Sequence, residues 1–175
     1  MRRRTFVTLA LAGLVGGAGC LDRAQGPAEG APKSVSDSRP VSGLVPDLPV
    51  TEKTDIVKRG VESAPVTIAD LDAFRTALEE RDVVVERLES NDGYLALDHP
   101  FDDGGLADPL GVVAGCYAAY VGGADDRRTL SATTFFEGEP VGEYAVLAAW
   151  VDEYERGVLT TKEYGEKVLG TVTTA

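Results

Sequence analysis

The prolines of this chain are concentrated in one stretch, which limits where a folded core can form. Six of the nine prolines lie in residues 21–65, a segment rich in Gly and Ser that contains no aromatic residue. Such a composition buries too little apolar surface to offset the entropy of ordering the chain. We therefore predict an acidic linker over residues 21–65 and a single domain over residues 66–175. Residues 44–61 are more apolar, so this part of the linker either lies against the domain or forms a short helix near residues 55–63.

The first 20 residues have the layout of an export signal. Arg2, Arg3 and Arg4 form a positive start, an apolar stretch of about ten residues follows, and small residues lead to Cys20. A helix that spans a bilayer needs about 20 apolar residues, so a permanent transmembrane anchor is not expected. The sequence predicts a signal peptide over residues 1–20, and an ordinary N-terminal helix is the alternative.

Two motifs refine the interpretation of this leader. Arg3-Arg4-Thr5-Phe6-Val7 resembles the twin-arginine export motif, in which Arg3, Arg4 and Phe6 are the residues that match. Gly17-Ala18-Gly19-Cys20 resembles a lipobox, whose cysteine takes a lipid and becomes the new N-terminus. The resemblance implies a protein attached to the membrane by a lipid on Cys20, on the extracytoplasmic face of the cell membrane. A cleaved secretory signal without a lipid is the alternative.

The chain contains only one other cysteine. If Cys20 carries a lipid, Cys116 has no partner, so we expect the domain to fold without a disulfide. Cys116 lies in an apolar stretch with no Lys, Arg or His within five residues, which indicates a buried core residue rather than a reactive thiol.

The charge balance limits the possible partners. The net charge is −12, and removal of the leader takes away three arginines and no acid, which leaves −15. Nucleic acids and anionic lipid headgroups require clustered positive charge, so no nucleic-acid partner is expected. The acid excess, together with 12 Arg against 5 Lys, resembles proteins of extreme halophiles. An acidic mesophilic protein is the alternative.

The apolar periodicity of residues 66–175 predicts an α+β domain with the element order α-β-β-α-β-β-α. We expect one four-stranded antiparallel sheet with the helices mainly on one face. Two capping boxes, Thr67–Asp70 and Thr160–Glu163, predict the starts of the first and last helices. The predicted strands span residues 82–88, 94–98, 130–136 and 141–150, with a turn at Asn91-Asp92-Gly93 and a helix over residues 109–121.

The densest polar cluster of the domain surrounds the only histidine, His99. The carboxylates of Asp98, Asp102 and Asp103 are the candidate ligands for a hard cation such as Ca²⁺, although the spacing of a calcium loop is absent. A solvated acidic loop beside a helix start explains the same residues. No motif for a nucleophile, a phosphate loop or a metal centre is present, so we predict no catalytic residue, no metal and no cofactor.

The leader, spacer and domain together resemble the small twin-arginine-exported lipoproteins of haloarchaea. The leader motifs carry most of this resemblance, and a helix with Gly and Tyr followed by Trp150-Val-Asp-Glu-Tyr154 carries the rest. The resemblance implies no active-site residue. We expect a lipid-anchored, non-catalytic binding or interaction domain whose protein or small-molecule partner the sequence does not identify. The alternative is a small enzyme or cation-binding domain that uses the acidic loop around His99.

Overall fold

The computed structural model describes residues 49–124 and 126–174, all of which fall in one compact unit. The predicted export and lipid sites, Arg3, Arg4, Phe6 and Cys20, lie outside the described residues. The helices are α1 (Val50–Glu62), α2 (Leu71–Glu79), α3 (Ala107–Ala124), α4 (Ala148–Glu155) and α5 (Thr161–Leu169). The strands are β1 (Arg87–Asn91), β2 (Tyr94–Pro100), β3 (Thr129–Phe136), β4 (Glu139–Val146) and β5 (Thr173–Thr174).

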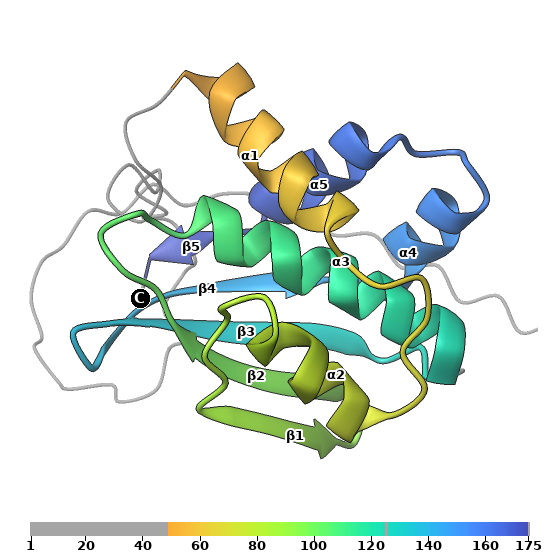
Figure 1. The fold of residues 1–175 in the computed structure, drawn as a ribbon, viewed down its shortest axis with the longest axis horizontal. Coiled ribbons are helices and arrows are strands. Elements are labelled where there is room, and N and C mark those ends of the chain that lie inside the picture. Colours follow the sequence, from red (N-terminus) through yellow and green to blue (C-terminus); the bar gives the residue numbers. More distant parts are fainter. Residues whose placement is uncertain (1–48, 125, 175) are drawn as a thin grey trace, which may run out of the picture. The chain divides into compact units, whose positions relative to one another are not determined.

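The fold is a mixed α+β domain built on a five-stranded sheet with the order β1-β2-β3-β4-β5 (Figure 1). The prediction of four antiparallel strands is wrong in two respects. β2 and β3 pair in parallel, from Tyr94 opposite Thr129 to Pro100 opposite Phe135, and β5 adds a fifth strand. The parallel pair follows from α3, since a helix between two strands carries the chain back across the sheet before the second strand begins.

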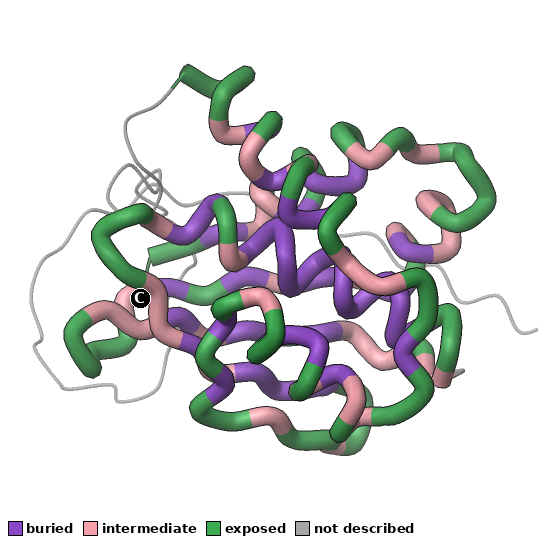
Figure 2. The backbone as a smooth tube through the Cα atoms, in the orientation of Figure 1, coloured by how far each residue is buried: buried purple, intermediate pink, exposed green. Residues whose placement is uncertain are grey.

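The helix α3 forms the centre of the molecule. It lies between the sheet and a second layer formed by α1 and α5, and all its residues from Leu110 to Val121 are buried (Figures 1 and 2). A helix that is apolar on every side must be covered on every side. Among the described residues, no helix combines the length and apolarity needed to cross a membrane.

The helix α1 lies inside the segment predicted as a linker. It covers the expected helix near residues 55–63 but starts earlier, and it buries Val57 and Val61 against the core. Glycines allow this close packing. A Cβ on Gly111 would lie 2.4 Å from the carbonyl oxygen of Val57, and one on Gly115 would lie 2.5 Å from that of Val61. The packed core therefore includes residues of the segment predicted as a linker.

Three local predictions need correction. The N-cap of α2 is Asp70, whose carboxylate accepts from the Ala73 N–H at 2.8 Å, so Thr67 is not the cap. The first strand covers Arg87–Asn91 rather than residues 82–88. The strand predicted over residues 141–150 ends at Val146, and Trp150 lies on α4.

Other local signals are confirmed. The last helix opens with the predicted capping box, in which Thr160 Oγ1 accepts from the Glu163 N–H and the Glu163 carboxylate accepts from the Thr160 N–H. The first hairpin turns at Asp92-Gly93, where Gly93 has a φ of 100°, a left-handed conformation that glycine adopts without strain. Both signals are local, and neither depends on the rest of the fold.

Candidate functional site

The residues of the predicted acidic cluster around His99 do not lie together, because the cluster begins on a strand. Successive side chains of β2 point to opposite faces of the sheet. Asp98 lies on the face away from the helices, where it accepts two hydrogen bonds from Arg87, from Nε at 2.7 Å and from Nη2 at 3.0 Å. His99 lies on the helix side and is fully buried. The candidate cation ligands therefore do not converge around the imidazole.

His99 is hydrogen-bonded to Tyr144 in the core, and both of its ring nitrogens have a partner. Its Nδ1 lies 3.3 Å from the Pro100 carbonyl oxygen, which only accepts, so Nδ1 carries the proton. Its Nε2 then accepts from the Tyr144 hydroxyl at 2.8 Å. Burial lowers the pKa of His99 to about 4 and holds the pKa of Tyr144 well above its usual range. At neutral pH both groups are uncharged and paired, so His99 acts as a structural residue.

This pairing predicts a pH dependence of folding. The unfolded chain protonates His99 below about pH 6.5, but the folded protein does so only below about pH 4. The unfolded state therefore binds more protons in this window, and stability falls as the pH drops through it. Relative to His99→Gln, the wild type should lose about 3 kcal/mol between pH 6.5 and 4.

Denaturant unfolding of both proteins at a series of pH values measures this difference. The comparison cancels the effect of the many carboxylates, which titrate in both chains. Parallel stability curves for wild type and His99→Gln would show that His99 is not the group responsible.

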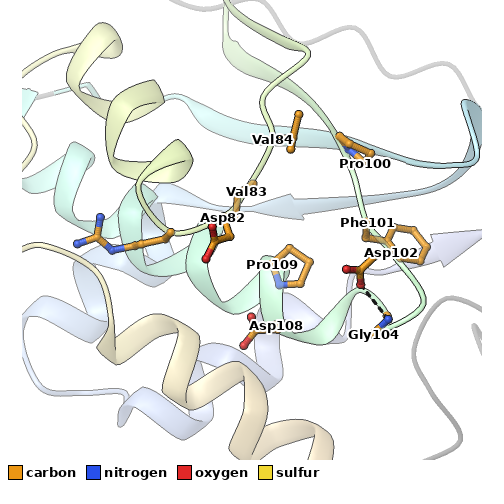
Figure 3. A pocket seen from close by; sticks show the side chains of 11 residues that line it. Asp82, Val83, Val84, Pro100, Phe101, Asp102, Gly104, Asp108 and Pro109 are labelled. Carbon is orange, nitrogen blue, oxygen red and sulfur yellow. Dashed lines mark hydrogen bonds between the residues drawn. The ribbon is translucent and has the colours of Figure 1, made fainter.

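The pocket that adjoins the acidic loop is lined by three segments (Figure 3). These are the chain after α2, the loop after β2 and the first turn of α3, and together they enclose about 390 Å³. Its apolar lining residues are Val83, Val84, Pro100, Phe101 and Pro109. Its charged lining residues are Arg81, Asp82, Asp102 and Asp108.

The charge of this pocket is negative. Arg81 is the single basic residue of the lining, and its guanidinium donates to the carbonyl oxygens of Ser63 and Ala77, both at 2.8 Å. Asp82 adopts a φ of 63° in the turn that ends α2, a conformation that Asp tolerates better than most residues. Asp102 accepts from the Gly104 N–H at 2.8 Å (Figure 3). Three aspartates and one arginine therefore line the pocket together with its apolar residues, which gives the lining a net negative charge.

The predicted candidates contribute only partly to this pocket. Asp102 lines it, whereas Asp98, His99 and Asp103 do not. Within residues 49–124 and 126–174, no group of three or more His, Cys, Asp or Glu side chains is arranged to hold a metal ion. The acidic loop thus contributes Asp102 to the edge of the pocket, and the described part of the loop does not form a metal-ion site.

Sequence reasoning missed three charged residues of the pocket. Arg81 and Asp82 lie in the turn after α2, about twenty residues before the acidic loop, and Asp108 lies in the first turn of α3. Only the packing of α2 beside α3 brings these segments together. Asp108 was the one residue with a local signal, because it precedes Pro109 at a predicted helix start.

Cys116 is confirmed as a free, fully buried core residue. Its Sγ lies 3.9 Å from the Ala77 carbonyl oxygen, and burial raises the pKa of the thiol to about 11. A thiol that keeps its proton at neutral pH is a poor nucleophile. Cys116 therefore offers no catalytic function.

A family model described as a domain of unknown function (DUF8159) matches residues 65–175. No curated protein matches the chain. No solved structure matches it either.

Proposed function

The chain belongs to the DUF8159 family, whose model covers more than half of its length, and we propose that it is a lipid-anchored extracytoplasmic protein with a non-catalytic binding domain. One observation supports the binding role above the enzymatic alternative. His99, the only histidine, is buried in the core against Tyr144, while the adjoining pocket is lined by three aspartates, one arginine and several apolar side chains. Geometry of this kind suits recognition better than acid–base chemistry.

The pocket favours a ligand with a positive charge on an apolar body. Asp82, Asp102 and Asp108 attract a cation, while Val84 and Phe101 offer apolar contact. The side chain of a lysine or arginine in a partner protein has this chemistry, and so does a small organic ammonium ion. An anionic ligand of the same size meets repulsion from the carboxylates.

This binding role can be tested with a matched pair of probes. Phenylethylammonium is expected to shift the backbone amide resonances of residues 101–105, whereas phenylacetate of similar size is not. Asp102→Asn should weaken the shift, and Asp72→Asn, an exposed control on α2 outside the pocket, should leave it unchanged. The titration is done at the lowest salt that keeps the chain folded, since salt screens the attraction. Equal responses to both probes would rule out this pocket as a cation site.

The anchor rests on the leader motifs and on Cys20. Cys20→Ser is expected to release the protein from the membrane fraction or to leave its precursor uncleaved. Replacing Arg3 and Arg4 with lysine should block export by the twin-arginine route. Cell fractionation and mass measurement check both results. A processed Cys20→Ser protein that stays in the membrane fraction like wild type contradicts lipidation at that residue.

We also propose that the protein is adapted to high salt, as the resemblance to haloarchaeal lipoproteins implies. The leaderless chain carries −15, and its carboxylates repel one another over about 30 Å at 0.01 M salt but only about 3 Å at 1 M. Since the folded state concentrates this charge, low salt should unfold the chain and molar KCl should restore it. Circular dichroism across a salt series measures the effect. A melting temperature that does not change with salt excludes this adaptation.

A further inference from the structure

The strand β1 forms one edge of the sheet, and no described segment pairs with its outer side. Asn91 and Tyr94 flank the two-residue turn, so they form a hydrogen-bonded pair. Along an antiparallel ladder, hydrogen-bonded pairs alternate with non-hydrogen-bonded pairs. Arg87 and Glu89 therefore direct their backbone groups to β2. The N–H and C=O groups of Leu88 and Ser90 face outward.

This edge is held in place by side chains from neighbouring elements. Arg128 donates from Nη1 to the Asn91 carbonyl oxygen at 3.0 Å and also to Ser90 Oγ. Arg87 donates two hydrogen bonds to Asp98, and its Nη1 also lies 3.5 Å from the Glu89 carboxylate on the same strand. A strand that is already ordered loses little conformational freedom on pairing, and an open edge of this kind is a template for another strand.

We propose that β1 pairs antiparallel with β1 of a second copy, about a two-fold axis at Leu88. This register places Arg87 of each copy opposite Glu89 of the other, so that two pairs of opposite charges face each other across the axis. Cross-strand neighbours have Cβ atoms about 5 Å apart, close enough for these side chains to interact. The two Leu88 side chains, which are half-buried and lie opposite Leu97 within each copy, meet on the other face of the sheet.

The charges on β1 select this register over its neighbours. An axis at Glu89 places Glu89 opposite Glu89 of the second copy, and an axis at Arg87 places two guanidinium groups together. Like charges directly opposite each other destabilise a strand pair. Only the axis at Leu88 places the Arg87 side chain of each copy opposite the Glu89 side chain of the other. The same axis places the outward backbone N–H and C=O groups of the two Leu88 residues opposite each other.

The pairing is expected to depend on concentration and salt. Five residues per strand bury less than the roughly 1,200 Å² of a small stable interface. The net negative charge of each copy also opposes association at low salt. Attachment of both copies to one membrane would raise their local concentration, a consequence that rests on the proposed lipid anchor. The pairing itself does not depend on that anchor.

Cysteine cross-linking tests the register in the full chain carrying Cys20→Ser, so that buried Cys116 is the only other thiol. With Leu88→Cys, the two introduced cysteines meet at the axis, within the Cα separation of about 4.4–6.8 Å that a disulfide requires. With Ser90→Cys, the two introduced cysteines would lie about 14 Å apart along the strands. In about 1 M KCl, Leu88→Cys is expected to form a reducible dimer on mild oxidation, and Ser90→Cys is not.

A charge reversal tests the pairing energy independently. Adding Glu89→Arg to the Leu88→Cys chain should lower the cross-linking yield about tenfold, because it replaces two attractive pairs with two repulsive ones. Glu139→Arg, the same reversal at an exposed position on β4, should leave the yield unchanged. Thermal melts confirm that each variant is folded. Absence of a dimer with Leu88→Cys, equal cross-linking of the two cysteine variants, or cross-linking with Ser90→Cys alone overturns the proposal.

Discussion

Replacing Gly111 with alanine is expected to lower the free energy of unfolding by about 2 kcal/mol, although the same change in a helix interior normally raises it. Alanine gains about 1 kcal/mol over glycine in helix propensity. At Gly111, however, the new methyl group would lie 2.4 Å from the Val57 carbonyl oxygen and 2.9 Å from its Cα. Backbone atoms cannot rotate away, so α1 must shift, at a cost of about 3 kcal/mol.

Gly122 on the same helix provides the matched control. A Cβ there would lie 2.4 Å from Glu155 Oε1, the far end of a flexible side chain that can move. Gly122→Ala should therefore be neutral or stabilising by about 1 kcal/mol. The midpoints of denaturant unfolding give both values. If Gly111→Ala unfolds at the same midpoint as Gly122→Ala, then the close contact between α1 and α3 does not determine stability.

The elements that sequence reasoning identified correctly are those with local chemical signals. The capping box at Thr160 and the turn at Asp92-Gly93 determine their own geometry, so each could be recognised without the rest of the fold. The end of β4 carried no such signal. If residues 141–150 formed a strand, apolar side chains would lie on both of its faces. A short apolar run of this kind fits a strand or a helix equally well. Packing alone decides that α4 begins at Ala148.

The direction of β3 could not be predicted from its own residues. Its alternation fits a parallel or an antiparallel partner, and the choice depends on how α3 crosses the sheet. The candidate site shows the same limit. Asp98 and His99 are neighbours in sequence, yet strand geometry sends them to opposite faces. Asp82 and Asp102 line the same pocket only because α2 packs beside α3.

Removing α1 should lower the free energy of unfolding more than any other change considered. The family match begins at residue 65, but the packed core also includes residues of α1. The helix α1 buries Thr54, Val57, Gly60 and Val61. Burying Val57 and Val61 contributes about 3–6 kcal/mol together. Without α1, the glycine face of α3 and the side of α5 that carries Gly165 would also lose their cover. A domain of this size has only about 5–15 kcal/mol of stability.

A chain of residues 65–175 is therefore expected to lack a cooperative thermal transition, whereas a chain of residues 49–175 should melt cooperatively. Circular dichroism and hydrogen exchange of the α3 amides measure the difference, since an uncovered α3 exchanges faster. Val57→Asp in the longer chain tests the same interface without deleting residues, because it places an unpaired charge against α3. If residues 65–175 fold as stably as residues 49–175, then α1 only covers a domain that is complete without it. If instead both the truncation and Val57→Asp unfold the chain, then α1 is part of the domain, and the proposed linker is shortened to the residues before it.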